Sequence, residues 1–109
     1  MILIIGGKAQ GKTEYARKVY EGQAEIFDDF QDWFRESLLK DDRPEEKVRE
    51  YISANPREVI ISDEVGNGVI PMDPFERKYR EELGRTLIMI AEKADSVIRI
   101  FCGIPQKIK

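Results

Sequence analysis

The first thirteen residues of this chain set a glycine-rich loop between an apolar segment and a segment with helical periodicity. Residues 1–5 are all apolar, as expected of a parallel strand that is buried on both faces of a sheet. Residues 6–13 fit the pattern G-x-x-x-x-G-K-[ST] at every defined position. Apolar side chains in residues 12–21 then recur on one helical face. This order of strand, loop and helix predicts an α/β fold whose first loop, a P-loop or Walker A motif, binds a nucleoside triphosphate.

The residue types in this loop suit contact with phosphate. Glycine has no Cβ, so backbone N–H groups can approach an anion closely, and the helix that follows adds the partial positive charge of its N-terminus. Lys12 is expected to reach the β- and γ-phosphates and Thr13 to ligate Mg²⁺ through its hydroxyl. Lys8 either contacts phosphate or faces water. The predicted nucleotide-binding residues are Gly6, Gly7, Lys8, Ala9, Gln10, Gly11, Lys12 and Thr13.

The composition limits the class of protein. A length of 109 residues fits a single domain over residues 1–109. A net charge of −3 argues against nucleic acid or an anionic membrane as the main partner, and no apolar stretch approaches the roughly 18 to 20 residues of a membrane span. One cysteine cannot form an internal disulfide, so we expect a cytoplasmic protein. The chain has no histidine, which excludes histidine as an acid, base, metal ligand or covalent intermediate.

Strand-like and helix-like segments alternate along the chain. Strands are expected over residues 1–5, 24–27, 58–62 and 97–102, and helices over residues 12–21, 30–40, 44–55 and from 74 onward. The pattern predicts a P-loop NTPase-like three-layer sandwich with a mainly parallel sheet of about four strands. Trp33 and Tyr79 are interpreted as core residues.

The long helix before the last strand has a clear predicted start. Asp73 is expected to be its N-cap, Pro74 its first residue and Glu76 the partner that completes a capping box. Its apolar residues recur at steps of four: Phe75, Tyr79, Leu83, Leu87 and Ala91.

Two pairs of acidic residues follow predicted strands. In an open parallel sheet, ligands bind at the carboxyl ends of the strands, so a carboxylate that holds Mg²⁺ is expected there. Asp28 and Asp29 follow the second strand, and Asp63 and Glu64 follow the third. We favour Asp28 and Glu64 as functional, while Asp29 or Asp63 could hold the metal instead and Asp29 could simply cap the next helix.

The third strand and the loop after it carry the most specific pattern in the chain. Residues 59–71, which contain Glu64-Val65-Gly66, resemble the E-V-G-x-G-[IV]-[IV]-P segment of the bifunctional adenosylcobinamide kinase/adenosylcobinamide-phosphate guanylyltransferase family of cobalamin biosynthesis. Further segments are similar to that family's motifs: residues 6–13 to its glycine-rich loop, 77–85 to R-x-[FY]-R-x-x-x-G-R, 91–95 to A-x-x-A-D, 103–105 to G-[IL]-P, 108–109 to [IL]-K and, more loosely, 28–33 to D-C-L-T-x-W.

The chain also departs from that family. Its members are longer and carry, between the first helix and the aspartate-bearing strand, a segment with the histidine that accepts GMP. Here residues 21–23 occupy that place and no histidine exists. The resemblance therefore implies the kinase half of the activity, which needs only the loop, Mg²⁺ and an acceptor hydroxyl, and guanylyl transfer is not expected.

The leading hypothesis is a kinase that transfers the γ-phosphoryl group of ATP or GTP to an adenosylcobinamide-like hydroxyl acceptor. Lys12 would neutralise developing charge, Thr13 and Asp28 would hold Mg²⁺, and Glu64 would orient the acceptor or a water. The alternative is a non-catalytic or slowly hydrolysing nucleotide-binding module. The resemblance further implies a corrinoid ligand and a ring-like homo-oligomer.

Overall fold

A computed structural model describes residues 1–40, 43–64 and 73–109 of the chain. Its strands and helices follow in the order β1 (Ile2–Gly6), α1 (Lys12–Tyr20), β2 (Ile26–Phe27), α2 (Phe30–Leu39), α3 (Pro44–Ala54), β3 (Val59–Asp63), α4 (Pro74–Lys93), β4 (Ser96–Phe101) and β5 (Ile104–Lys107). The predicted α/β class is confirmed, and most predicted elements end within one or two residues of the observed ones.

The sheet is mainly parallel, with β1 at its centre. Its five strands lie in the order β2-β3-β1-β4-β5, and β1 pairs in parallel with both β3 and β4. The prediction of about four strands missed β5, which returns antiparallel to β4 through a tight turn at Cys102 and Gly103. Residues 104–107 are all exposed and contain Pro105, so they lack the alternation of apolar and polar residues that marks a strand.

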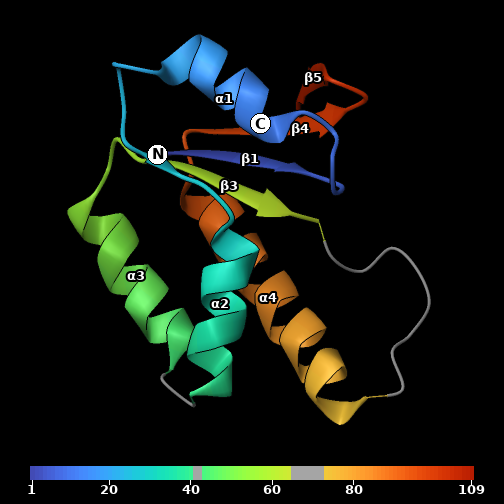
Figure 1. The fold of residues 1–109 in the computed structure, drawn as a ribbon. Coiled ribbons are helices and arrows are strands. Elements are labelled where there is room, and N and C mark those ends of the chain that lie inside the picture. Colours follow the sequence, from blue (N-terminus) through green and yellow to red (C-terminus); the bar gives the residue numbers. More distant parts are fainter. Residues whose placement is uncertain (41–42, 65–72) are drawn as a thin grey trace.

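Helices cover both faces of this sheet, as predicted (Figure 1). Helix α1 lies on one face, and α2, α3 and α4 lie together on the other. Successive side chains along each strand point alternately to the two faces of the sheet, and therefore to the two helix layers. Along β1, Leu3 packs with the three-helix side and Ile4 with the α1 side, and Ile60 and Ile61 divide in the same way on β3.

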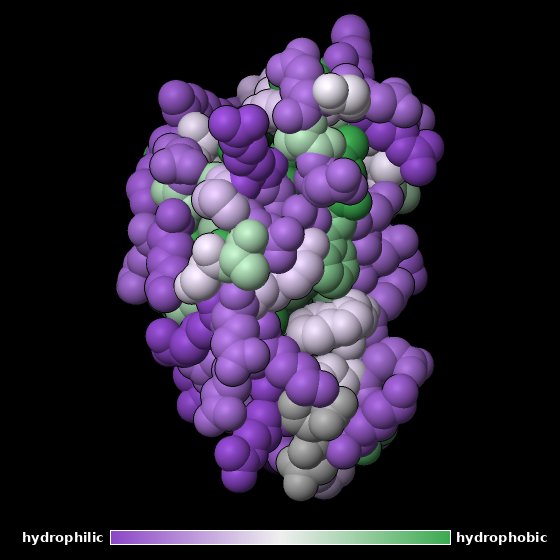
Figure 2. Space-filling model, turned by 90° about the vertical axis from the view of Figure 1, so that its left-hand side faces the viewer, coloured by the Kyte–Doolittle hydropathy of each residue, from purple (hydrophilic) through white to green (hydrophobic). Residues whose placement is uncertain are grey.

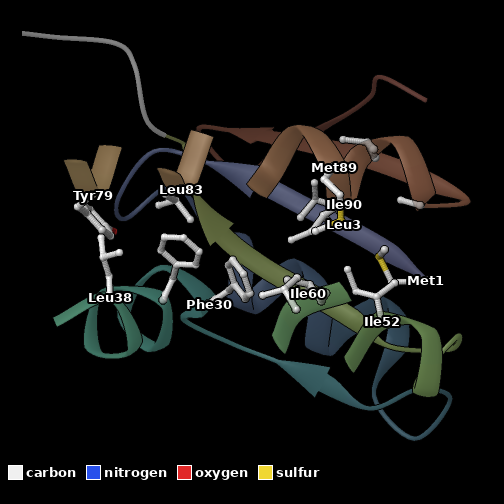
Figure 3. Close-up of a cluster of buried hydrophobic side chains, with 14 residues drawn as sticks. Met1, Leu3, Phe30, Leu38, Ile52, Ile60, Tyr79, Leu83, Met89 and Ile90 are labelled. Atoms are coloured by element: carbon white, nitrogen blue, oxygen red, sulfur yellow. The ribbon is translucent and has the colours of Figure 1, made fainter. Parts of the chain in front are cut away.

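The larger of the two apolar clusters fills the space between the sheet and helices α2, α3 and α4 (Figure 3). Tyr79 and Leu83 of α4 are buried in it, and Leu87 and Ala91 pack against it half-buried. The apolar stripe predicted for this helix therefore faces the core, and Tyr79 is a core residue as expected. Trp33 is half-buried against the same cluster.

The start of α4 combines a predicted and an unpredicted contact. The side chain of Asp73 accepts a hydrogen bond from the Phe75 N–H at 2.9 Å, which confirms the predicted N-cap. Glu76, predicted to complete a capping box, instead forms an ion pair with Arg35 of α2. This pair ties two helices of the same layer together.

The surface is strongly polar, in keeping with 36% charged residues. Figure 2 shows hydrophilic side chains over most of one face, with a narrow strip of hydrophobic ones between them. Within the described ranges, no helix is both long enough and apolar enough to cross a membrane.

Candidate phosphate-binding site

The phosphate loop joins the end of β1 to the start of α1, and two of its glycines are required by geometry. A Cβ at Gly6 would lie 2.5 Å from the carbonyl oxygen of Ile100, so a side chain there would force β1 and β4 apart. Gly11, the residue before α1, has a φ of 90°, in the left-handed region that favours glycine. These positions are the two glycines that define the motif.

Lys12 begins α1 and turns its side chain back into the loop. The side chain is 9% exposed, and its Nζ donates hydrogen bonds to the Gly7 carbonyl oxygen at 2.7 Å and to Asp63 Oδ1 at 2.8 Å. Asp63 lies opposite Gly6 in the pairing of β1 with β3, which brings its carboxylate to the mouth of the loop. A buried ammonium group held by oxygen atoms at this place suits a phosphate ligand.

Thr13 and Asp28 meet at the other side of the loop. The Thr13 hydroxyl lies 2.9 Å from Asp28 Oδ2 and 3.1 Å from Oδ1, and Asp28 Oδ1 also accepts the N–H of Asp29 at 2.8 Å. A hydroxyl and a carboxylate are hard oxygen ligands of the kind that Mg²⁺ prefers. The described residues contain no group of three acidic, cysteine or histidine side chains suited to a metal, so this pair fits a cation that takes its other ligands from phosphate and water.

These groups line one cavity of about 350 Å³ at the carboxyl end of the sheet. Its wall includes six of the eight predicted loop residues and three of the four predicted acids, Asp28, Asp29 and Asp63. The complete lining is Lys8, Ala9, Gln10, Gly11, Lys12, Thr13, Glu14, Asp28, Asp29, Gln31, Asp32 and Asp63. The structure thus brings both members of the first acidic pair and Asp63 of the second to the loop. Gly6 and Gly7 are the two predicted loop residues that do not line the cavity.

Glu64 lies elsewhere. Its N–H donates to the Gly6 carbonyl oxygen at 2.9 Å, but its carboxylate pairs with Arg99 of β4, at 2.7 Å from Nε and 3.2 Å from Nη2. Because neighbouring side chains point to opposite faces of a strand, Asp63 faces the loop and Glu64 faces the layer of α4. Glu64 lines a separate cavity there, with Leu87 and other apolar residues. The structure does not bring its carboxylate to the phosphate cavity.

Asp29 occupies the N-cap position of α2, but its side chain does not cap the helix. Its φ of 53° places it in the left-handed region, and its carboxylate accepts no hydrogen bond from the N–H groups of the first helical turn. The structure therefore contradicts the alternative in which Asp29 serves only as an N-cap.

Gln31 is a site residue that sequence reasoning missed. Only 7% of it is exposed; its Oε1 accepts the N–H of Asp63 at 3.0 Å, and its Nε2 lies 3.4 Å from Asp29 Oδ1. Burial raises the pKa of Tyr79 to about 12, so the Tyr79 hydroxyl stays protonated and contacts the Gln31 carbonyl oxygen at 3.4 Å. The signal that could have found Gln31 is a polar residue on the apolar face of a predicted helix, two residues after an acidic pair.

The loop is also braced by the turn between β4 and β5. Gln10 accepts the Cys102 N–H through its side-chain Oε1 at 2.7 Å and the Gly103 N–H through its carbonyl oxygen at 2.8 Å. A Cβ at Gly11 would lie 3.4 Å from the Gly103 Cα. The hairpin that sequence reasoning did not predict therefore supports the predicted loop.

Comparison with known proteins shows which family this chain belongs to. The model of the family described as cobinamide kinase / cobinamide phosphate guanyltransferase matches residues 21–108. The chain belongs to this family. The phosphate loop precedes the matched range, so its assignment depends on its own motif and geometry. Residues 65–72, which carry most of the predicted family-like loop, lie outside the described residues.

One curated relative is the bifunctional adenosylcobalamin biosynthesis protein CobP of Pseudomonas aeruginosa. It is 31% identical to this chain over an alignment of 83 residues, and the match covers 71% of the chain and 48% of the relative. The chain thus spans about half the length of the curated relative that it matches.

Proposed function

We propose that this chain is a kinase of the adenosylcobinamide kinase type, which transfers the γ-phosphoryl group of ATP or GTP to a hydroxyl group of a corrinoid acceptor. The main support is that two neighbouring loop residues are each paired with an acid from a different strand inside one cavity: Lys12 with Asp63, and Thr13 with Asp28. The family membership supports the same activity.

Phosphoryl transfer requires positioning and charge neutralisation more than covalent chemistry. The ammonium group of Lys12 is buried, so its attraction to a phosphate oxygen is screened less than at the surface. The N-terminus of α1 and the loop N–H groups add to this field. Thr13 and Asp28 are the residues that would hold Mg²⁺, which supplies further neutralisation of phosphate charge when bound.

Glu64 is the proposed group that orients the acceptor or a water. Its N–H bond to the Gly6 carbonyl oxygen holds it at the start of the loop, although its carboxylate is paired with Arg99. Asp63, whose carboxylate lines the cavity, is the second candidate for this role.

A nucleotide-binding module that hydrolyses slowly or not at all is the second candidate function. The contacts in the cavity, Lys12 with Asp63 and Thr13 with Asp28, are equally those that nucleotide binding without transfer requires. A homo-oligomer is expected from the resemblance under either function.

One experiment separates the two functions. The protein is incubated with Mg²⁺ and γ-labelled ATP or GTP, with and without adenosylcobinamide. Label in the corrinoid supports the kinase, whereas label in inorganic phosphate alone, or bound nucleotide without turnover, supports the module. Failure to bind either triphosphate would contradict both.

A further inference from the structure

The phosphate cavity has two sides, and a pair of side chains forms each of them. On one side, Lys12 Nζ donates to Asp63 Oδ1 at 2.8 Å; on the other, the Thr13 hydroxyl donates to Asp28 Oδ2 at 2.9 Å. Asp63 ends β3, whereas Asp28 follows β2. A nucleotide that contacts Lys12 through phosphate and the other pair through a metal ion needs both acids in fixed positions.

One side chain joins the two strand ends that carry these acids. Gln31, in the first turn of α2, accepts the Asp63 N–H through Oε1 at 3.0 Å, and its Nε2 donates to Asp29 Oδ1 at 3.4 Å. The N–H of Asp29 in turn donates to Asp28 Oδ1 at 2.8 Å. These contacts close a ring around the cavity whose members are, in order, Lys12, Asp63, Gln31, Asp29, Asp28 and Thr13.

The side-chain amide of Gln31 has one favourable orientation in this ring. Its oxygen can only accept hydrogen bonds and its NH₂ group donates them. The opposite orientation would set the NH₂ group against the Asp63 N–H and the oxygen against the Asp29 carboxylate. Gln31 is only 7% exposed, so losing a partner would leave a polar group with little access to water. The amide therefore fixes Asp63 and Asp29 relative to each other.

The backbone of Gln31 is anchored in the core of the protein. The Tyr79 hydroxyl donates to the Gln31 carbonyl oxygen at 3.4 Å, and the preceding residue, Phe30, is 2% exposed. Phe30 and Tyr79 both belong to the larger apolar cluster (Figure 3). A side chain that positions others works best from a rigid element, and the first turn of α2 provides one.

The backbone conformation of Asp29 agrees with a positioning role for Gln31. Its φ of 53° and ψ of 44° lie in the left-handed region, which costs energy for a residue other than glycine. Such a conformation persists where the surrounding contacts determine it. Here Asp28 accepts the Asp29 N–H, and Gln31 donates to the Asp29 carboxylate, which lines the cavity.

We propose that Gln31 is a positioning residue of the phosphate site, which holds Asp28 and Asp29 in place relative to Asp63 and thereby couples metal binding to nucleotide binding. This inference rests on the proposed nucleotide-binding function. Gln31 acts through these acids and takes no part in bond formation. The affinity that Mg²⁺ adds depends on where the carboxylates stand, whereas the affinity that comes from Lys12 and the loop N–H groups does not.

The test measures the Kd of the β,γ-imido analogues of ATP and GTP, with and without Mg²⁺, by titration calorimetry. Mg²⁺ should tighten binding to the parent. Gln31→Met keeps the length of the side chain and removes both amide contacts, so it should reduce this gain about three- to tenfold, as loss of one hydrogen bond does. The Kd without Mg²⁺ should change by less than about twofold, because Lys12 and Asp63 remain paired. Equal weakening with and without Mg²⁺, or no change in either, would overturn the positioning role.

Asp29→Ala tests the same link from its other end. Asp29 is exposed, so this variant is available even if Gln31→Met does not fold. It should also reduce the gain from Mg²⁺, and an unchanged gain would contradict the proposal. In the Asp29→Ala background, Gln31→Met should cost little further, because the link is already lost. A full additional loss there would show that the two residues act independently, which the proposal excludes.

Gln23→Met is the matched control. Gln23 is exposed between α1 and β2 and is not one of the residues that line the phosphate cavity. Both of its Kd values should equal those of the parent. A loss of the Mg²⁺ gain as large as in Gln31→Met would contradict the proposal.

Failure of the kinase function is recognised separately. Absence of label transfer to every acceptor would contradict the kinase, whereas the Mg²⁺ gain in Gln31→Met, which needs no turnover, decides the role of Gln31. A parent that binds neither analogue would contradict both.

Discussion

Lys12 is the residue on which nucleotide affinity should depend most. Its buried ammonium group donates to Gly7 and Asp63 within the loop and is the cation best placed for phosphate. Lys12→Ala should weaken binding of Mg²⁺–ATP or Mg²⁺–GTP by roughly ten- to hundredfold, the usual range for hydrogen bonds from a charged group. Titration calorimetry measures the change. Lys18→Ala, on the exposed side of α1, is the matched control and should bind normally; an unchanged affinity in Lys12→Ala would show that the site is wrongly assigned.

At the scale of one element, two neighbouring acids at the end of β3 face opposite sides of the sheet. Asp63 points to the phosphate loop and Glu64 to Arg99 on the other face. If Glu64 orients the acceptor, Glu64→Gln should bind nucleotide almost normally while phosphoryl transfer falls by about 10²- to 10⁴-fold. Rates and Kd values for the same variant measure the two effects separately.

Asp63→Asn is the companion variant for that prediction. It should lower nucleotide binding as well as turnover, because Asp63 is the partner of Lys12. Unchanged turnover in Glu64→Gln, together with loss in Asp63→Asn, would assign the positioning role to Asp63.

The ion pair between α2 and α4 should make stability depend on pH. The hydrogen bond from Arg35 holds the pKa of Glu76 below its ordinary value of 4.5, so the stabilisation is present above that value and is lost as the pH falls through the lower, folded-state pKa. Arg35 also lies over the rings of Phe75 and Tyr79, 5.3 and 5.1 Å from their centroids. Glu76→Gln should therefore lower the thermal midpoint at pH 7, and the difference from the parent should be smaller at pH 3.

Glu45→Gln provides the comparison for that prediction. Glu45 pairs with Arg49 at 3.3 Å within the exposed surface of α3, where an ion pair contributes little. Its midpoint should match that of the parent at both pH values. A midpoint difference for Glu76→Gln that stays constant from pH 7 to pH 3 would exclude the ion pair as the cause.

Across the whole molecule, the absence of histidine removes the acceptor for a histidine-linked guanylyl group. The protein should therefore retain no acid-labile label after incubation with α-labelled GTP and denaturation. Label that survives denaturation and is released by acid would contradict this expectation. A covalent adduct would require another nucleophile, since no histidine stands anywhere in the 109 residues.

Local patterns in the sequence were enough to predict the loop, all four helices of the described residues and the parallel core of the sheet. The run over residues 1–5, the spacing of the loop glycines and Lys12, and the stripe along α4 each specify an element through neighbouring residues. Asp73 also caps α4 as predicted, since a cap needs only the N–H groups of the next turn. The same patterns placed Asp28 and Asp63 at strand ends, beside the loop.

Other features depended on contacts between residues far apart in the chain. The apolar run 59–61 is buried on both faces of the sheet, so it carries no alternation that reveals which of Asp63 and Glu64 faces the loop. The pleat of β3 in its pairing with β1 decides this. Strand β5, with no apolar pattern of its own, is defined by its hydrogen bonds to β4.

The sequence by itself determined that this chain has a glycine-rich loop between a buried strand and a helix, because that motif requires only adjacent residues of the right type. Tertiary structure alone decided that Gln31 joins Asp63 to Asp29. A side chain's partners depend on which elements pack against it, and that packing brings together residues that no local pattern relates.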